Sequence, residues 1–274
     1  MISIDYKHKE IEVNIGEIPS YISTPLTLKI VNPVSKRVTW EVELDTNSWA
    51  KYPNTEIYNA LVYDANKTLL WEKSWSVQEY GFELYKKFYY YILSLKSKGT
   101  KPKGVAIGTH DGEFGEWVPS VIFNQTDATL VEASNNQFKE LKKNYSKYTN
   151  VKLLNLLVTK DGKPTSFWEG GKGYTNSVVK RVPEAQEIEP ISPTIYPSIN
   201  INDLIKDKVD WLHLDVEGYD HILIKSLKNL PNCIIFEWEN LLTEELEDIK
   251  NFLTNKGYKL DFENNVSCLA LKTD

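Results

Sequence analysis

The sequence predicts an α/β fold, in which a largely parallel sheet with intervening helices follows a small antiparallel β-sandwich. Two observations lead to this fold class. Apolar and polar residues alternate with a period of two in residues 1–75, whereas short apolar runs alternate with helical patterns from Gly104 onward. We therefore expect a sandwich domain at 1–75, a linking helix at 76–101 and an α/β domain at 102–274.

Alternating runs and one hairpin account for the predicted sandwich. The runs cover residues 2–6, 11–15, 26–30 and 38–44, with Pro, Gly and Asn between them. Such alternation is typical of half-buried antiparallel strands. Two further runs, at 59–63 and 68–71, flank the polar stretch Asp64-Ala-Asn-Lys67 and predict a hairpin.

A helical period replaces the alternation after residue 76. The apolar residues at three- and four-residue spacing are Tyr80, Leu84, Phe88, Ile92 and Leu95. Ser76 is a candidate N-cap, and Glu79 three residues later completes a capping box. Gly99-Thr-Lys-Pro102 ends the predicted helix.

Strands and helices alternate in the predicted α/β domain. The apolar runs are 105–107, 129–131, 151–158, 211–214 and 234–236, and the clearest helical patterns are 138–145, 222–230 and 244–253. Two final runs, 258–262 and 266–271, are joined by Glu263-Asn-Asn265 and predict a terminal hairpin. Sheets of this kind bind ligands outside the carboxyl ends of their strands.

Composition limits the classes of partner. The 274 residues are 41% apolar and 26% charged, with a net charge of −6. We therefore expect no nucleic-acid partner. Neither a signal peptide nor a bilayer-spanning apolar segment is visible, so we expect a cytoplasmic protein with no membrane partner. Cys233 and Cys268 lie in apolar, strand-like contexts, which favours buried thiols.

The first motif that carries chemistry is Val105-Ala-Ile-Gly-Thr-His-Asp-Gly-Glu-Phe-Gly115. It predicts a buried strand, a turn containing Gly108 and Gly112, and then a helix. Glycines let the backbone approach a ligand closely, and the helix N-terminus offers N–H groups. A purely structural turn is the alternative.

The second motif, Thr129-Leu-Val-Glu-Ala-Ser134, places Glu132 at a strand end, twenty residues after Gly112. An acid at this place can accept hydrogen bonds from both ribose hydroxyls of an adenosine-bearing cofactor. The residues leave both NAD and S-adenosylmethionine open. The first loop lacks the G-x-G-x-x-G run that holds a pyrophosphate, which favours S-adenosylmethionine.

The third motif is Val209-Asp-Trp-Leu-His-Leu-Asp-Val-Glu-Gly-Tyr-Asp220. It gathers Asp215, Glu217 and Asp220 around Gly218 at a strand end. Three such carboxylates need cations, hydrogen-bond donors or a shared proton. Alternatively, they are helix N-terminal acids stabilised by the macrodipole.

These motifs, in this order, resemble the FkbM-type methyltransferase family. The matching segments are Ile107-Gly-Thr-His-Asp-Gly112, Val131-Glu-Ala133, Leu153-Leu-Asn-Leu-Leu-Val-Thr159 with Asp161-Gly162, Leu214-Asp-Val-Glu-Gly-Tyr-Asp220 and Ile234-Ile-Phe-Glu237. The resemblance covers about residues 103–272 and leaves the sandwich outside. It implies a Rossmann-like class I methyltransferase domain that uses S-adenosylmethionine, commonly for O-methylation of sugars or sugar-containing natural products.

The resemblance also implies roles for individual residues. The implied cofactor contacts are Gly108, Thr109, His110, Asp111, Gly112, Phe114, Glu132, Ala133, Ser134, Asn155, Leu156, Leu157 and Asp215. Glu132 would hold the ribose, and Asp215 would lie near the sulfonium. The family usually has Asp two residues before the first glycine, where this chain has Ala106; Asp111 is a candidate substitute for binding the cofactor's amino group.

A hydroxyl acceptor needs a base, and the candidates are His110, Asp215, Glu217 and His221. His221 follows Glu217 by four residues, so a shared helix face is expected. His213 is better interpreted as a buried, hydrogen-bonded core histidine. A divalent metal ion is not expected, although Asp215, Glu217 and Glu237 are of the right type to bind one.

The acceptor is predicted to be a sugar, a glycan or a glycosylated small molecule. Trp168 and Tyr174 can stack on a sugar ring, and Asn176, Ser177 and Glu237 can bind its hydroxyls. A flexible surface loop is an equal alternative for residues 168–178.

Two other functions stay open from the sequence. One is a non-catalytic carbohydrate-binding or assembly protein in which the methyltransferase domain has decayed, and the other is a nicotinamide-dependent oxidoreductase. The sequence also leaves homo-oligomerisation open.

Overall fold

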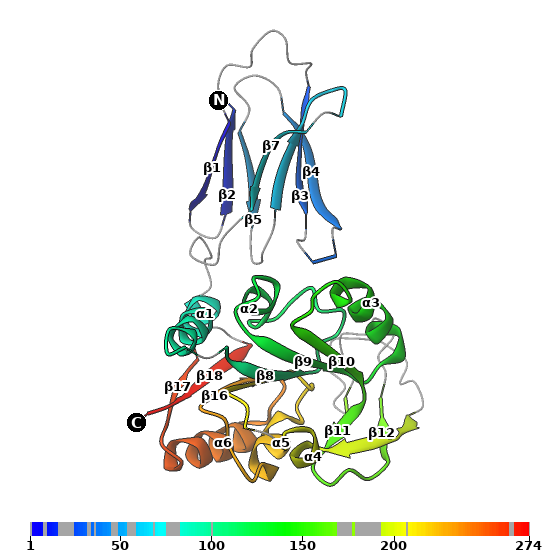
Figure 1. Cartoon of the computed structure of the whole chain (residues 1–274), viewed down its shortest axis with the longest axis vertical. Coiled ribbons are helices and arrows are strands. Elements are labelled where there is room, and N and C mark those ends of the chain that lie inside the picture. The colour runs from blue at the N-terminus through cyan, green and yellow to red at the C-terminus, as the bar shows by residue number, and fades with distance from the viewer. Residues whose placement is uncertain are drawn as a thin grey trace. The chain divides into compact units, whose positions relative to one another are not determined.

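A computed structural model describes most of the chain (Figure 1). The described residues are 2–7, 10–15, 25–31, 34–35, 37–44, 49–53, 59–67, 69–74, 83–99, 101–168, 177–178, 193–206, 208–262 and 266–273. The chain forms two compact units, residues 1–86 and 87–274. Each unit is described by itself.

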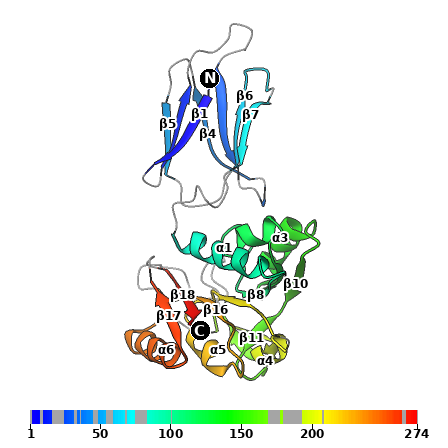
Figure 2. The same cartoon turned by 60° about the vertical axis from the view of Figure 1, so that its left-hand side comes forward.

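The first unit contains two antiparallel sheets (Figure 2). The three-stranded sheet has the order β1-β2-β5 and consists of β1 (Ile2–Lys7), β2 (Glu10–Ile15) and β5 (Trp49–Pro53). The four-stranded sheet has the order β4-β3-β6-β7 and consists of β3 (Leu26–Val31), β4 (Val38–Leu44), β6 (Asn59–Tyr63) and β7 (Leu69–Ser74). The predicted antiparallel strands are therefore present.

β3 shows why the alternating residues of this region predict strands. Leu26, Leu28 and Ile30 are buried, whereas Thr27 and Lys29 between them are partly exposed. Successive side chains of a strand point to opposite faces, so this alternation gives one apolar face. The packing of the two sheets into a sandwich stays a prediction.

The predicted hairpin is observed between β6 and β7, where Asp64 closes the turn by accepting the Lys67 N–H at 2.9 Å. In contrast, β5 was absent from the predicted strands. It pairs only with β2 in its sheet and ends at Pro53. A short strand at a sheet edge tolerates proline and carries little alternation, which explains why the pattern did not reveal it.

The linking helix is observed as α1 (Glu83–Lys96), and the proposed cap at Ser76 and Glu79 lies outside the described residues. From Lys87 onward the helix packs on the second unit. Phe88 contacts Trp211 edge-to-face at 5.5 Å between ring centroids, and the Tyr91 hydroxyl donates to the Asp210 carbonyl at 3.2 Å.

The second unit is built on a seven-stranded sheet. Its order is β10-β9-β8-β15-β16-β18-β17, formed by β8 (Lys103–Ile107), β9 (Asp127–Glu132), β10 (Val151–Asn155), β15 (Trp211–Leu214), β16 (Cys233–Glu237), β17 (Tyr258–Asp261) and β18 (Ser267–Lys272). All pairs are parallel except those of β18. The alternating pattern therefore predicted both the parallel sheet and the terminal hairpin. The strand order reverses between β8 and β15, where such sheets bind ligands.

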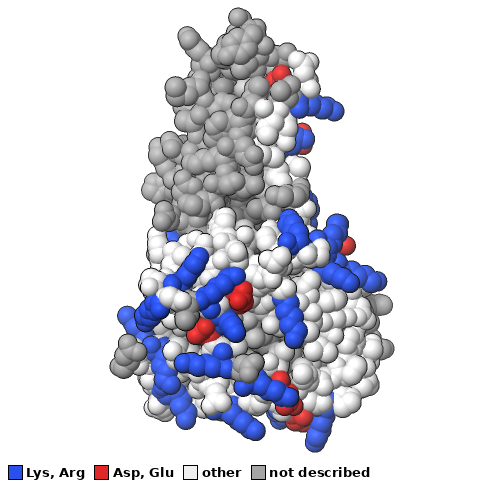
Figure 3. Space-filling model, in the orientation of Figure 1, with Lys and Arg blue, Asp and Glu red and all other residues white. Residues whose placement is uncertain are grey.

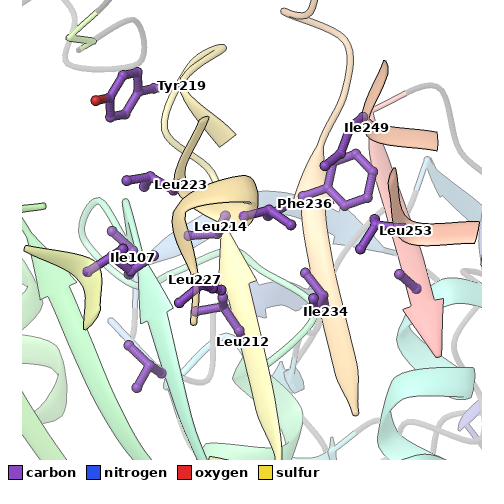
Figure 4. Close-up of a cluster of buried hydrophobic side chains, with 14 of the residues drawn as sticks. Ile107, Leu212, Leu214, Tyr219, Leu223, Leu227, Ile234, Phe236, Ile249 and Leu253 are labelled. Carbon is purple, nitrogen blue, oxygen red and sulfur yellow. The ribbon is translucent and has the colours of Figure 1, made fainter. Parts of the chain in front are cut away.

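Helices cover both faces of this sheet (Figures 1 and 2). One face carries α1, α2 (Val118–Ile122) and α3 (Asn135–Tyr145), and the other carries α4 (Ile201–Leu204), α5 (Asp220–Ser226) and α6 (Thr243–Asn255). Figure 4 shows side chains of β15 and β16 packed with those of α5 and α6, including Leu214, Leu223, Phe236 and Ile249. Cys233 and Cys268 lie on neighbouring strands as buried free thiols, as predicted.

Three predicted elements have different bounds in the structure. The expected strand 151–158 is two strands, because β10 ends at Asn155 and β11 (Leu157–Thr159) leaves the large sheet to pair with β14 (Ser198–Asn200). A second small pair joins β12 (Thr165–Phe167) to β13 (Thr194–Tyr196). The helix expected at 222–230 runs from Asp220 to Ser226. Asn202 ends it by donating to the Ser226 carbonyl and accepting the Lys228 N–H.

The third difference concerns the glycine turn, which was expected to lead directly into a helix. The chain after Gly112 instead forms turns and bends, and α2 begins only at Val118. Gly115 adopts a φ of +126°, and Pro119 is at the start of the helix. The turn therefore offers backbone groups of an irregular loop, and not of a helix N-terminus.

Basic side chains are prominent on the face of this unit that Figure 3 shows, where Lys and Arg predominate over Asp and Glu. At the amino ends of β15 and β16 a surface hollow is lined by Lys206, Lys208, Lys225, Lys228, Lys256 and Lys272. These lysines come from separate segments, so the sequence showed no basic stripe. Among the described helices, none has the length and hydrophobicity that crossing a bilayer requires.

We predict that Trp211→Ala destabilises the second unit by about 3–5 kcal/mol, because Trp211 is fully buried against Phe88 and its indole N–H donates to Thr126 Oγ1 at 2.9 Å. Urea unfolding followed by the helical circular-dichroism signal measures this loss. Phe123→Ala is the control, since that ring is 38% exposed, and it should cost less than about 1 kcal/mol. Equal losses for the two variants would contradict the assignment of Trp211 to the core.

Candidate active site

A deep pocket opens at the carboxyl ends of β8, β9 and β15. Its cavity volume is about 180 Å³. Its walls come from the turn after β8, the end of β9, the β10–β11 connection and the turn after β15.

The glycine turn forms the floor of this pocket. Gly108 has a φ of +77°, and a Cβ on it would lie 1.7 Å from the carbonyl oxygen of Asp215. Any side chain at this position would therefore separate the turn after β8 from the turn after β15. The turn is fixed to β9 as well, because the Gly108 and Thr109 N–H groups both donate to the Val131 carbonyl. The glycine is therefore needed for contact between the two backbones.

The far side of the turn is held by α3. The Tyr145 hydroxyl donates to the Gly112 carbonyl at 2.7 Å, and Asn144 Nδ2 donates to the Asp111 carbonyl at 2.9 Å. A Cβ on Gly112 would overlap the Tyr145 ring at 2.4 Å. Gly112 therefore packs against the helix and does not line the pocket.

Glu132 lies at the end of β9, and its carboxylate points toward the glycine turn. One carboxylate oxygen accepts the His110 N–H and the other accepts the Ser134 N–H, each at 2.8 Å. The residue is 6% exposed, and burial raises its pKa although these N–H groups act in the opposite direction. Each oxygen still has a second lone pair for a ligand in the pocket.

His110 is one of three polar residues of the turn that line the pocket, with Thr109 and Asp111. Its backbone has a φ of 50°, a left-handed conformation that is uncommon outside glycine. The Glu132 carboxylate stabilises this conformation through the His110 N–H. His110 Nδ1 lies 3.2 Å from Asp111 Oδ1, which in turn accepts the Glu113 N–H at 3.0 Å.

A second group of acids lies at the ends of β15 and β16. Asn240 Nδ2 donates to Glu217 Oε2 at 2.7 Å and to Glu237 Oε1 at 3.0 Å, and the Glu237 N–H donates to Asp220 at 3.3 Å. Asp215 and Glu217 line the pocket, whereas Glu237 and Asp220 lie behind them. The third sequence motif therefore forms a cluster of carboxylates next to the cofactor turn.

Enclosure in the protein raises the pKa of every acid in this cluster. Asp215 is open to the pocket at its own surface, but desolvation by the surrounding protein and the neighbouring Glu237 raise its pKa to about 7. Burial followed by the charge of Glu237 raises that of Glu217 to about 9. Burial followed by the charge of Asp220 raises that of Glu237 to about 8, and Asp220 itself rises to about 7 through burial and Asp215.

His213 is the buried, hydrogen-bonded histidine that the sequence predicted. Its Nε2 lies 2.8 Å from Glu116 Oε2. Burial would raise the pKa of Glu116, but the hydrogen bond and the charge of His213 outweigh it and hold that pKa below its usual value. His213 also lines the pocket, and the sequence gave no sign of its Glu116 partner.

The predicted acceptor loop reaches the pocket at its described ends. Trp168 and Ser177 form a two-way backbone bridge, with N–H···O distances of 2.9 and 3.0 Å. Ser177 Oγ donates to the Glu217 carbonyl at 2.9 Å, and Ser177 lines the pocket together with Phe167 and Val178. Tyr174 and Asn176 lie outside the described residues.

The structure brings most of the predicted cofactor residues together in the pocket wall. These are Gly108, Thr109, His110, Asp111, Phe114, Glu132, Ala133, Leu156, Leu157 and Asp215. Three of the predicted cofactor residues do not line the pocket but lie just outside its lining: Gly112, Ser134 and Asn155. Asn155 Nδ2 donates to the carbonyls of Glu132 and Ala133, at 2.9 Å each, so it supports the β9 end.

The helix-face argument for His221 is wrong. Glu217 has a φ of 54° and precedes α5, which begins at Asp220, so Glu217 and His221 do not share a helix. His221 does not line the pocket, and its Nε2 lies 3.5 Å from Glu245 of α6. His110, Asp215 and Glu217 are the candidate bases that do line it.

Sequence reasoning missed several residues of the site. The pocket wall also includes Gly115, Trp117, Val158 and Tyr219. Asn240 was missed as well, although it bridges two of the acids. Its place three residues after the strand-end Glu237 is the only signal that the sequence contains.

Comparison with known proteins gives a family match and distant structural similarities. A family model described as the methyltransferase FkbM domain matches residues 72–260. No curated protein matches the chain in sequence.

Comparison with solved structures gives similarities at low identity. The similar structures include a precorrin-6y C5,15-methyltransferase from Geobacter metallireducens (14% identity, 69% of this chain and 88% of that one, TM-score 0.36). They also include a Podospora anserina methyltransferase with S-adenosylhomocysteine bound (12%, 68% and 77%, 0.38) and a Methanococcus jannaschii fibrillarin pre-rRNA processing protein (15%, 99% and 98%, 0.40).

The raised pKa values of the acid cluster predict how stability depends on pH. A folded state that keeps protons which the unfolded chain has lost becomes less stable as the pH rises, here between about 4 and the folded pKa of about 8 for Glu237. Glu237→Gln removes this loss of stability, because glutamine has no proton to lose in this pH range. In EDTA-containing buffer its melting temperature, relative to that of the unmodified protein, should rise between pH 6 and pH 9.

Glu244→Gln is the control, because Glu244 is an exposed residue of the first turn of α6. Its melting temperature should equal that of the unmodified protein at every pH. If Glu237→Gln lost as much stability between pH 6 and pH 9 as the unmodified protein, the Glu237 carboxyl would not hold a proton in the folded state.

Proposed function

Because the chain belongs to the FkbM methyltransferase family, whose methyl donor is S-adenosylmethionine, we propose that it methylates a hydroxyl group of a sugar, a glycan or a glycosylated small molecule. The family match covers more than half of the chain. The observation that carries the proposal is the shared pocket: the glycine turn, Glu132 and the strand-end acid Asp215 all line it.

The residues present fit S-adenosylmethionine. The buried Glu132 carboxylate is oriented by two backbone N–H groups and keeps lone pairs for the ribose hydroxyls. Leu156 and Leu157 offer apolar surface for the adenine. Asp111 lines the pocket where an acid is needed for the cofactor's amino group, which supports its proposed substitution for the acid absent at Ala106.

When bound, S-adenosylmethionine supplies a methyl group that is already activated for transfer. The chain's own task is then to align the acceptor hydroxyl and to take its proton. His110 is our candidate for the base, because it lines the pocket and its Nδ1 lies 3.2 Å from the Asp111 carboxylate, which would stabilise a protonated ring. Its Nε2 can then accept the proton from the hydroxyl.

The acceptor half of the pocket is rich in hydrogen-bonding groups. Asp215 and Glu217 line it beside Ser177 and the aromatic ring of Phe167. Carboxylates beside an aromatic ring suit a polyhydroxylated ligand, whose hydroxyls donate while its apolar face packs on the ring. Trp168, held against Ser177, is placed at the start of the proposed acceptor loop.

We predict that the protein binds S-adenosylhomocysteine, and that Glu132→Gln weakens this binding about 10- to 100-fold. The lost interactions are hydrogen bonds to a charged group, which contribute about 1.5–3 kcal/mol. Isothermal titration calorimetry measures the affinity, and circular dichroism checks that the variant is folded.

Glu140→Gln is the matched control, since Glu140 is exposed on α3, and its affinity should equal that of the unmodified protein. A titration with NAD should give no heat. The absence of heat with S-adenosylhomocysteine, or heat with NAD alone, would overturn the proposal.

We further predict that His110→Asn lowers kcat by about 10²- to 10⁴-fold, the usual contribution of a general base, while the affinity for S-adenosylhomocysteine stays within about threefold. Asparagine tolerates the left-handed backbone of residue 110, so this substitution removes the imidazole and keeps the turn. Transfer of a tritiated methyl group to an acceptor found in a glycan screen gives kcat.

His221→Asn tests the alternative base. Because His221 lies outside the pocket against Glu245, kcat should stay within about twofold. A large loss in this variant together with little loss in His110→Asn would reject His110 as the base.

A further inference from the structure

Three carboxylates beside the cofactor pocket are close enough to bind one ion. Asp215, Glu217 and Glu237 each offer one oxygen, and these three atoms lie within 4.8 Å of one another. The residues come from two adjacent strand ends, after β15 and at the last position of β16. The sheet therefore fixes their mutual positions.

Unpartnered buried oxygens are a second, independent observation that points to a bound ligand at this place. Glu237 is 7% exposed, and its Oε2 has no hydrogen-bond partner among the described residues. Behind it lies Asp220, which is 0% exposed and has one oxygen bonded to the Glu237 N–H while its Oδ2 is also unpartnered. Buried polar atoms are nearly always satisfied in folded proteins, so two such oxygens at one place need an explanation.

The neighbouring protein groups do not neutralise these acids. Asn240 donates one hydrogen bond to Glu217 and one to Glu237 and carries no charge. The nearby His213 is paired with Glu116. Among the described residues whose charges act most strongly on Asp215, Glu217, Asp220 and Glu237, none is a lysine or an arginine, and the one cationic side chain among them, His213, acts on Asp215.

We propose that Asp215, Glu217 and Glu237 bind a hard divalent cation, such as Mg²⁺, at the acceptor side of the pocket. Oxygen ligands without sulfur or imidazole suit Mg²⁺, Mn²⁺ and Ca²⁺ more than zinc or copper. Two oxygens that share one Mg²⁺ can be at most about 4.2 Å apart, and two that share one Ca²⁺ at most about 5 Å apart. The three oxygens, which lie within 4.8 Å of one another, are therefore close enough to share one such ion after small side-chain movements.

The cation gives the pocket a way to hold the acceptor. Three protein ligands leave coordination positions for two hydroxyl oxygens of a sugar, because Asp215 and Glu217 face the pocket. Coordination lowers the pKa of a hydroxyl and fixes its direction. This role rests on the proposed function, whereas binding of the cation does not.

Mn²⁺ is the probe for the test, because its paramagnetic resonance signal reports the unbound ion directly. The protein, freed of metal with EDTA and then dialysed, should bind one Mn²⁺ per chain, and Mg²⁺ should displace it. Glu217→Gln and Glu237→Gln should each weaken Mn²⁺ binding at least tenfold. Glutamine has the shape of a protonated glutamic acid, so both variants should fold, and circular dichroism checks this.

Glu244→Gln serves again as the control and should bind Mn²⁺ like the unmodified protein. S-adenosylhomocysteine affinity, measured on the same samples, separates this inference from the proposed function. Mn²⁺ binding that depends on the three acids supports the inference even where S-adenosylhomocysteine gives no heat. Two results would overturn the inference, even where S-adenosylhomocysteine binds. One is that the protein shows no saturable binding at millimolar Mn²⁺, and the other is that both glutamine variants bind Mn²⁺ as tightly as the unmodified protein.

Discussion

The pocket depends on the contact between two strand-end turns, at Gly108 and Asp215. Parallel pairing places Ile107 opposite Leu214, so β8 and β15 end at the same level of the sheet. The Asp215 N–H then donates to the Ile107 carbonyl, and the missing Cβ of Gly108 lets its backbone touch the Asp215 carbonyl. Because the strand order reverses here, the two chains leave in different directions and open a crevice. The glycine turn and the acid cluster share one pocket for this reason.

Enclosed negative charge is the energetic cost of this arrangement. Burial of a carboxylate is unfavourable unless hydrogen bonds or opposite charges compensate. Glu116 is compensated by His213, and Glu132 by two backbone N–H groups. Glu217 and Glu237 share the side-chain amide of Asn240, and burial together with neighbouring carboxylates raises their pKa values. The least compensated acids are those next to the proposed acceptor, as expected where groups are kept for a ligand and not for stability.

The sequence predicted the features that depend on a local pattern of residues. The parallel strands, the glycine turn and Glu132 at a strand end follow from period and residue type, and the structure places Glu132 toward the turn. The sequence predictions were wrong where contacts between residues far apart in the sequence determine the structure. Asn202 ends α5 from another element, and the left-handed backbone of Glu217 separates it from that helix. Likewise, Asn240 and the lysine-lined hollow assemble from segments that are far apart in sequence.

Glu217 links the acceptor loop to the acid cluster. A left-handed backbone at a residue other than glycine costs about 1–3 kcal/mol and persists only where the surroundings hold it. Here Ser177 binds its carbonyl and Asn240 binds its carboxylate, and Ser177 is in turn held by Trp168. The proposed cofactor half of the pocket is thus built from strands and their own turns, whereas the proposed acceptor half depends on contacts between distant segments. If the proposal holds, substitutions at Trp168 or Ser177 move the Glu217 carboxylate and change the accepted substrate while the cofactor half stays intact.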